Sequence, residues 1–186
     1  MNKTAKTLFI IGVSCILLSL LLLARFEIEE VYSKEMNSGT MSVLLEKTKK
    51  IEDKKESITI NGLEYVGYLE IPTLNLNLAI TKNYSYESLK ISPSIYYGSI
   101  KSKNLVICGH SYKAHFGSLY KLKKGDTIIF TDISNNKYVY EVELIEELSP
   151  TSIKEMIESD FDLTLYTCTK DALKRVVIRC NMVSAN

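Results

Sequence analysis

Apolar and polar positions divide this chain into three stretches with different periodicity. From Leu8 to Ala24 no charged residue interrupts a run rich in Leu and Ile. From Glu27 to Ile51 the chain is charged, and its apolar residues recur at helical spacing. From Ile58 onward, short apolar runs and alternating segments are typical of β-strands. The pattern predicts a membrane-spanning segment, a helical and charged linker and a β-rich domain, over residues 1–26, 27–57 and 58–186.

The first stretch is long enough to cross a membrane. As a helix it rises about 25 Å, close to the ~30 Å hydrocarbon core, and Arg25 can extend its charge to the interface. A cleaved signal peptide is the alternative, but its apolar region usually ends in a small-x-small site. Here the run ends Leu22-Leu-Ala-Arg-Phe26, without that site. We therefore expect an uncleaved anchor.

Charges on either side of this run predict its orientation. Lys3 and Lys6 precede it, whereas Arg25 is followed by Glu27 and two further glutamates. Because Lys and Arg are retained on the cytoplasmic side, we expect a cytoplasmic N-terminus and an extracellular domain. The protein would then be a single-pass protein of the cell membrane.

The second stretch predicts an amphipathic helix or stalk that no proline interrupts. Its stripe consists of Met41, Leu44, Leu45, Thr48 and Ile51. Residues 46–56 carry mixed charge, and we expect them to form a solvated linker. A role on anionic lipid is less favoured, because the acidic residues offset much of the basic charge.

The third stretch predicts seven strands and two short helices. The strands are Tyr65–Ile71, Leu74–Ile80, Leu105–Cys108, Asp126–Ile133, Tyr138–Leu144, Leu163–Cys168 and Arg175–Met182. The turn residues of Ser134–Lys137 predict a hairpin loop between two of them. One helix is expected near Tyr86–Lys90. The other starts around Pro150, where Ser152-Ile-Lys-Glu155 matches a capping box. Many short strands and few helices favour an all-β barrel or sandwich.

Composition narrows the function classes. The net charge of +1 gives no support to nucleic-acid binding. Four cysteines without a CxxC pair indicate neither a zinc site nor a dense disulfide framework. An extracellular domain that does not use its cysteines as cross-links is expected to keep at least one for its reactivity. No cluster of loop acids indicates a calcium site, and we expect no required metal or other cofactor.

Three separated residues could together carry chemistry. Cys168 ends one predicted strand, and Arg175 begins the next after a turn of six residues, so the thiol and the guanidinium should lie at the same end of the sheet. His110 follows the buried strand Leu105–Cys108. A thiol, an imidazole and a fixed positive charge are the groups needed for acyl transfer through a thioester.

These residues lie in motifs that resemble the sortase family. The motifs are Asn104-Leu-Val-Ile-Cys-Gly-His110, Thr164-Leu-Tyr-Thr-Cys168 and Arg175-Val-Val-Ile, and the resemblance extends over roughly residues 62–183. Sortases are membrane-anchored cysteine transpeptidases of Gram-positive bacteria with an eight-stranded β-barrel. The resemblance therefore implies a closed barrel of this kind, with short helices.

The resemblance also implies roles and partners. Cys168 would attack an LPxTG-like sorting signal of a secreted protein and form a thioester. His110 would protonate the leaving amine and then deprotonate the incoming one, which belongs to a peptidoglycan precursor. Arg175 would bind substrate and stabilise the oxyanion. The reactive species is the thiolate, which a nearby positive charge favours.

Two candidates had competitors of the same residue type. Arg179 shares a strand face with Arg175 but lies about 13 Å farther along at the rise of a strand, so we assign it a surface or barrel-end role. His115 lies in a segment that reads as a loop, and we expect it to be exposed. Arg175 and His110 are therefore the preferred catalytic candidates.

Strand alternation predicts the floor of a substrate groove. Cys108, Tyr166 and Val177 share faces with the three catalytic candidates if their strands are regular. Thr167 is expected to contribute its backbone or hydroxyl to the substrate site. A bulge at Gly109 would break this parity. The segment 149–162 should form one wall of the groove with its short helix.

Subclass and reaction outcome remain open at this point. A short, single-domain chain with an uncleaved anchor looks most like class D sortases, with class A or E as alternatives. A Cys-His hydrolase that releases its acyl group to water is the alternative enzyme. A membrane-tethered β-domain for adhesion, without catalysis, is the alternative from another class.

Overall fold

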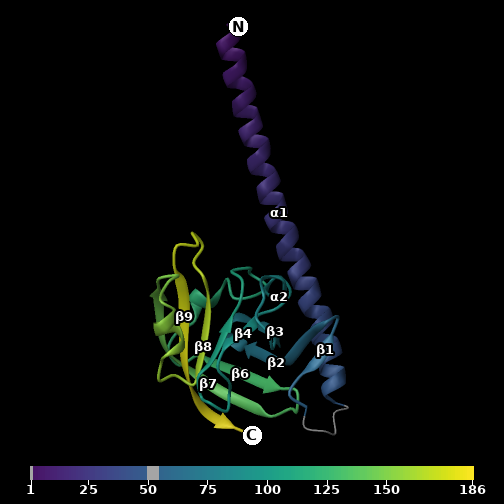
Figure 1. Cartoon of the computed structure of the whole chain (residues 1–186), viewed down its shortest axis with the longest axis vertical. Helices are drawn as coiled ribbons and strands as arrows, with labels where there is room; N and C mark the ends of the chain where they lie inside the picture. Colours follow the sequence, from purple (N-terminus) through teal and green to yellow (C-terminus); the bar gives the residue numbers. More distant parts are fainter. Residues whose placement is uncertain (1, 50–54) are drawn as a thin grey trace.

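The structure is a computed structural model that describes residues 2–49 and 55–186. Ile51 of the predicted stripe and residues 50–54 of the predicted linker lie outside the described residues. Within the described part, a long N-terminal helix stands beside a β-barrel, and the helix extends far beyond it (Figure 1).

Helix α1 runs without interruption from Lys3 to Thr48. Its most apolar window of 18 residues has a mean hydropathy of 2.7, and none of that window is buried, so by length and composition it could cross a membrane. The C-terminal half instead packs on the barrel. Its buried side chains follow helical spacing and are Ser33, Asn37, Thr40, Met41, Leu44 and Thr48. Leu45, which was predicted to join this stripe, is exposed.

Asn37 fastens this half of α1 to strand β3 (Leu76–Thr81). Its side-chain amide donates to the Asn77 carbonyl at 2.9 Å, and its side-chain oxygen accepts from the Ala79 amide at 3.2 Å. Met41 and Leu44 pack beside this bridge against Tyr65, in an apolar cluster separate from the barrel interior. The amphipathic pattern therefore marks a buried helix–barrel interface.

Eight strands close into a barrel. They are β2 (Leu63–Ile71), β3, β4 (Ser94–Tyr97), β5 (Leu105–Cys108), β8 (Leu163–Cys168), β9 (Arg175–Ala185), β7 (Lys137–Leu148) and β6 (Thr127–Asp132), in the order of their pairing. Pairing of β2 with β6 closes the ring, and β1 (Ile58–Ile60) adds a short edge strand to β2. The predicted closed eight-stranded barrel is confirmed.

Local chemistry explains several boundaries. The expected strand from Leu74 begins only at Leu76, because Pro72–Leu74 forms a 3-10 turn and Asn75 takes a left-handed conformation with φ 52°. Asp132 accepts the amides of Ser134 and Asn136 through its Oδ1, which forms the predicted hairpin loop between β6 and β7.

Strands β1 and β4 were not predicted, because each is only three or four residues long. The helices near residues 86 and 153 are present as α2 (Tyr86–Leu89) and α3 (Ile153–Ile157). The capping box predicted at Ser152 is wrong, since that side chain makes no capping bond. A capping box forms instead between Ser85 and Ser88, at the start of α2.

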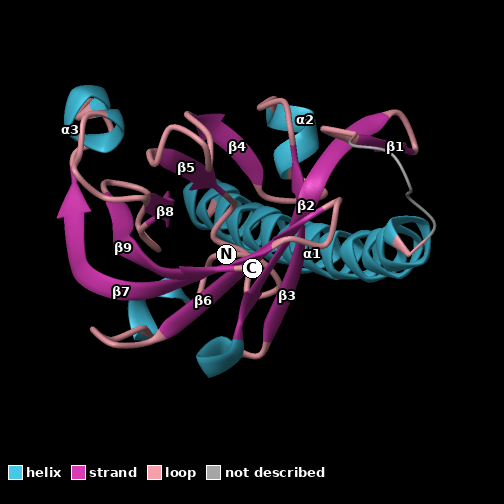
Figure 2. Cartoon of the chain, turned by 90° about the horizontal axis from the view of Figure 1, so that it is seen from below, coloured by secondary structure: helices cyan, strands magenta, loops and turns pink. Residues whose placement is uncertain are grey.

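Apolar side chains from all sides of the ring fill the barrel. Fully buried examples are Leu69, Ile80, Ile107, Phe116, Phe130, Tyr140, Leu165 and Ile178. Seen from below, α3 lies beyond the β7–β9 side of the barrel, away from β1 (Figure 2). This rigid ring fixes the strand ends on which the candidate residues stand.

Candidate active site

Cys168 and Arg175 face each other at one end of the barrel. They are paired residues in the antiparallel register of β8 and β9, at the last and first positions of these strands. Directly opposed residues in such a pair have Cβ atoms about 4.5–5.5 Å apart. Both side chains are partly exposed. The thiol and the guanidinium therefore share one accessible strand end.

His110 reaches the same end from β5. This strand runs parallel to β8, with Cys108 opposite Tyr166, and the pairing continues because the Gly109 amide donates to the Tyr166 carbonyl at 3.2 Å. His110 and Cys168 each come two residues after the last paired position. The parallel register therefore brings the backbone of His110 to the same strand end as Cys168.

Thr167 of β8 holds the backbone that follows β5 in place. It is buried, and its hydroxyl donates to the Gly109 carbonyl at 2.8 Å. Gly109 itself has no room for a side chain, because a Cβ there would lie 2.8 Å from the buried ring of Phe116. These contacts fix the backbone from which His110 projects.

Aromatic rings surround the His110 imidazole. Tyr86 meets it edge-on with centroids 5.7 Å apart, and Tyr112 lies at 4.9 Å. The Nε2 atom is buried and makes no hydrogen bond to any residue in 2–49 or 55–186. Burial lowers the pKa of His110, and Lys90 lowers it further, while the Glu29 carboxylate raises it. A neutral imidazole is therefore the favoured form at neutral pH.

Helix α1 braces the loop that carries His110, which we call the histidine loop (residues 109–118). The Tyr112 hydroxyl donates to the Glu29 carboxylate at 3.3 Å, and the Tyr112 ring meets the Phe26 ring edge-on at 6.0 Å. Burial and the Glu29 charge raise the pKa of Tyr112 to about 12, so it stays protonated as the donor. One flank of His110 thus rests on a residue that α1 holds.

The expectation that His115 is exposed is wrong. Its side chain is fully buried, with Nε2 2.7 Å from the Ser33 hydroxyl oxygen and 3.2 Å from the Ile91 carbonyl oxygen. A carbonyl oxygen only accepts, so Nε2 carries the proton of a neutral ring. Burial lowers the pKa of His115 to about 4. His115 therefore joins the histidine loop to α1, a contact that strand and turn patterns do not reveal.

The surface role expected for Arg179 is also wrong. This residue is only 2% exposed and pairs with Glu146 at 2.9 Å. Its guanidinium also donates to the carbonyls of Glu155 and Met156 and to the hydroxyls of Ser159 and Thr164. Arg179 thereby ties α3 and the segment after it to the barrel, and leaves Arg175 as the accessible arginine of β9.

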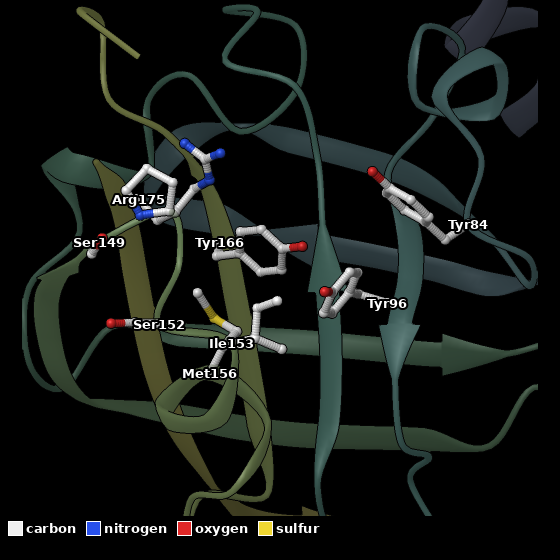
Figure 3. Close-up of a pocket in the computed structure, with 9 residues that line it drawn as sticks. Tyr84, Tyr96, Ser149, Ser152, Ile153, Met156, Tyr166 and Arg175 are labelled. Carbon is white, nitrogen blue, oxygen red and sulfur yellow. The ribbon is translucent and has the colours of Figure 1, made fainter. Parts of the chain in front are cut away.

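A pocket of about 180 Å³ opens beside Arg175 (Figure 3). It is lined by Tyr84, Tyr96, Ser149, Pro150, Ser152, Ile153, Met156, Tyr166 and Arg175. The rings of Tyr84, Tyr96 and Tyr166 follow one another edge to face, with centroids 5.5 and 5.4 Å apart. Residues of α3 and the turn before it form the opposite wall, as expected for segment 149–162. The lining therefore combines aromatic rings and hydroxyl groups with one guanidinium.

The predicted groove residues occupy different depths. Tyr166 lines the pocket. Cys108 and Val177 are buried, and the Cys108 thiol donates to the Ser94 carbonyl at 3.6 Å. The hydroxyl of Thr167 is engaged by Gly109. The geometry thus supports direct substrate contact for Tyr166 and a supporting role for the other three.

Cys168 differs from the other cysteines of the barrel in its access to solvent. Cys108 and Cys180 are buried, and burial raises the pKa of Cys108 to about 12 and raises that of Cys180 as well. Both are therefore thiols of low reactivity. Within residues 2–49 and 55–186, no group of three or more His, Cys, Asp or Glu side chains could hold a metal ion. The lack of a metal requirement stays a prediction.

Sequence reasoning missed several residues at this site. Tyr84 and Tyr96 come from the β3–α2 connection and the unpredicted strand β4, and Tyr86 comes from α2. Glu29 and Tyr112 meet across the helix–barrel interface. The one available signal was the abundance of tyrosine, 12 residues against no tryptophan, with three of them between residues 84 and 96.

Comparison with known proteins agrees with this geometry. A family model described as a sortase domain matches residues 69–183, more than half of the chain. Sortase A of Listeria monocytogenes is 29% identical over 120 residues, which are 60% of this chain and 54% of that protein. The chain therefore matches about half the length of this relative.

Solved structures share the fold. Sortase C of Clostridium perfringens SM101 is 28% identical with a TM-score of 0.56, covering 64% of this chain and 70% of that one. The Listeria monocytogenes sortase A structure is 25% identical with a TM-score of 0.61, covering 66% and 89%. A Clostridium perfringens sortase C with its C-terminal cell wall sorting motif reaches a TM-score of 0.65 at 23% identity, covering 79% and 99%.

Proposed function

Because the chain belongs to the sortase family, we propose that it is a membrane-anchored cysteine transpeptidase of secreted proteins. It cleaves an LPxTG-like sorting signal between the threonine and the next residue. It then transfers the acyl group to the amine of a peptidoglycan precursor. The observation that carries this proposal is the convergence of Cys168, Arg175 and His110 at one strand end through two independent registers.

In the acylation step, the Cys168 sulfur attacks the threonine carbonyl carbon. A C–S bond forms and the C–N bond to the next residue breaks. The Arg175 guanidinium stabilises the oxyanion that develops in between. His110 takes the thiol proton and delivers it to the leaving amine. The proton count is conserved, and neutral His110 begins and ends the step unchanged.

In the deacylation step, an incoming amine attacks the thioester carbonyl carbon. The C–N bond forms, the C–S bond breaks, and His110 passes the amine proton back to the Cys168 sulfur. A thioester is reactive enough for this exchange without an added energy source. Transfer to an amine rather than to water requires that the nucleophile be positioned better than bulk water.

The pocket lined by Tyr84, Tyr96 and Tyr166, which we call the tyrosine pocket, supports the substrate assignment. An LPxTG-like signal has apolar residues two and three positions before its threonine. Tyr96, Tyr166 and Met156 line the pocket together with Arg175, and their rings and thioether offer apolar contacts to an extended peptide. We infer that these residues hold the leucine and proline of the signal while Arg175 holds the threonine carbonyl.

The apolar run of α1 supports a single-pass anchor. With Lys3 and Lys6 on one side and glutamates on the other, we infer a cytoplasmic N-terminus and an extracellular barrel. This puts the enzyme where exported proteins and cell-wall precursors meet. A class D-like subclass is the one we favour.

The test uses the full chain in detergent with a fluorogenic LPxTG-like peptide and a saturating amine. We expect a new peptide–amine product, and a thioester on Cys168 detectable by mass spectrometry when the amine is omitted. Cys168→Ala should abolish both. Exclusive hydrolysis at saturating amine would replace the transferase with a hydrolase.

A tethered β-domain without catalysis is tested by the thiols themselves. Iodoacetamide should modify Cys168 in the folded protein and leave the buried Cys108 and Cys180 unmodified. No thioester from a library of LPxTG-like peptides, together with no loss of function in Cys168→Ala, would favour the non-catalytic reading.

A further inference from the structure

The active site lies close to the end of the apolar run, measured along α1. The run ends at Ala24, and Glu29 of the same unbroken helix already accepts a hydrogen bond from Tyr112, two residues beyond His110. Five residues of helix rise only about 7–8 Å. Along α1, the histidine loop is therefore separated from the C-terminal end of the apolar run by less than two helical turns.

The turn between β8 and β9 extends toward the apolar part of α1. It consists of residues 169–174 and connects Cys168 to Arg175. Figure 1 shows it as the part of the barrel that extends farthest toward the N-terminal half of α1, whereas the C-terminal end of β9 lies at the opposite end. The catalytic end of the barrel thus faces the bilayer that would hold α1.

This turn has a fixed shape that presents an apolar tip. The Ala172 amide donates to the Thr169 carbonyl at 2.9 Å, and the Thr169 amide donates to the Lys174 carbonyl at 3.0 Å. Asp171 accepts the Leu173 amide at 3.1 Å and the Thr169 hydroxyl, so its carboxylate is engaged inside the turn. Leu173 is left 70% exposed, the same as the most exposed leucines of the apolar run.

Another residue of this turn, Lys170, contacts an aromatic ring outside the turn. Lys170 places its ammonium 5.2 Å from the centre of the Tyr120 ring, and Tyr120 itself is half exposed. Lys121 lies beside the same ring. Tyrosine, lysine and exposed leucine are residue types that are found at membrane interfaces, where ring and ammonium meet the headgroups.

We propose that the turn of residues 169–174 contacts the outer surface of the bilayer that holds α1, with Leu173 inserted at the acyl boundary and Lys170 at anionic headgroups. The proposal rests on the membrane anchor of the proposed function. Its consequence is an orientation: Cys168 would open toward the membrane surface, within reach of substrates held in the bilayer.

Site-directed spin labelling of the full chain in liposomes with anionic lipid tests this contact. In a Cys168→Ala background, one label is attached to native Cys15 in the apolar run. With Cys15→Ser added, a second is attached at Leu173→Cys and a third at Val183→Cys. Val183 is the matched control, because it is 59% exposed near the far end of β9. The buried Cys108 and Cys180 should take no label, which the Cys15→Ser, Cys168→Ala protein checks.

We expect the label at 173 to collide with oxygen several-fold more than with a water-soluble nickel chelate, relative to the label at 183. Equal accessibility at 173 and 183 would overturn the proposal. The label at Cys15 separates this failure from failure of the anchor: a buried signal at 15 with an aqueous signal at 173 rejects only the contact, and an aqueous signal at 15 rejects the anchor on which it rests.

A functional arm uses Leu173→Glu with Val183→Glu as its control. With a sorting peptide carried on a lipid in the same liposomes, Leu173→Glu should be several-fold slower than the wild type. With the same peptide free in solution, its rate should be unchanged. Equal rates for wild type and Leu173→Glu on the lipid-linked peptide, or an equal loss on both peptides, would show that a bilayer contact at Leu173 does not orient Cys168 toward membrane-held substrates.

Discussion

Cys168 and Arg175 face each other across one pair of adjacent strands, whereas His110 is held by a loop that α1 braces from more than eighty residues earlier in the chain. The first pair needs only a six-residue turn and the register of β8 and β9. The histidine loop needs Ser33 and Glu29 on α1 as well as Thr167 on β8. The positions of Cys168 and Arg175 are thus set by neighbours along the chain, whereas the position of His110 depends on contacts with a distant part of the chain.

This difference links the candidate active site to the helix that could cross a membrane. Side chains that touch the substrate sit on strands that the barrel core fixes, and such positions tolerate little movement. The ring of Tyr112, which lies against His110, is instead tied to a helix that continues into the apolar run. A change in α1 should therefore alter proton transfer while leaving the thiol in place.

The largest expected effects come from substituting the two arginines of β9, and they differ in kind. Arg175→Gln should lower kcat/KM by about 10²–10³, as loss of a preorganised oxyanion donor does, with unchanged stability. Arg179→Gln should instead lower the free energy of unfolding by about 3 kcal/mol, because it strands the Glu146 carboxylate and the carbonyls around α3. Peptide kinetics and urea unfolding measure the two. A stable but inactive Arg179→Gln together with an active Arg175→Gln would reverse the assignment.

Asn37→Ala should weaken the contact between α1 and the barrel. Loss of its side chain leaves the buried Ala79 amide without its acceptor, which costs about 1–3 kcal/mol. Hydrogen exchange of the histidine loop should speed up, while exchange in β8 should not. Ser38→Ala is the control, since that hydroxyl is exposed and bonds only to Lys34 within the helix. Equal exchange of the loop in both variants would mean that α1 does not brace it.

His115 predicts a pH dependence of stability. Its pKa is about 4 in the folded protein against 6.5 when unperturbed, so the unfolded chain binds the proton more tightly. The stabilisation that comes from neutral His115 is fully present above about pH 6.5 and is lost as the pH falls toward about 4. The loss in the free energy of unfolding reaches about 2 kcal/mol near pH 5.

Urea unfolding at about pH 7.5 and about pH 5 measures this loss, with His115→Gln as the comparison. The variant has no group to protonate there and should lose less stability on acidification than the wild type. Because the pKa of His110 is lowered in both proteins, its own contribution cancels in the comparison. Identical losses would show that His115 is already protonated or exposed.

The smallest expected effect concerns Glu29→Gln. The carboxylate raises the pKa of His110, so its removal should lower that pKa. The limb of the pH–rate profile that follows His110 should therefore move to lower pH. Tyr112→Phe removes the hydrogen bond but keeps the Glu29 charge, and should leave that limb nearly in place. A shift in the Phe variant as large as in the Gln variant would assign the effect to positioning rather than charge.

The sequence by itself determined the parts of this protein that depend on neighbours along the chain. The apolar run of α1, the hairpin at Ser134–Lys137 and the opposition of Cys168 and Arg175 all follow from periodicity and turn chemistry over a few residues. The motifs that contain His110, Cys168 and Arg175 also occur in the order typical of sortases, and this order indicated the family and its eight-stranded barrel.

Only the tertiary structure determined which of two residues of the same type lies at the candidate site and which is buried elsewhere. His110 and His115 lie in one loop and Arg179 shares a strand with Arg175, yet one histidine and one arginine are buried in hydrogen bonds to α1 and α3. A side chain's burial depends on elements that arrive from distant parts of the chain, and local spacing carries no information about them. For the same reason, the tyrosine pocket and the direction in which the catalytic end faces emerge only when the strands and α1 are assembled.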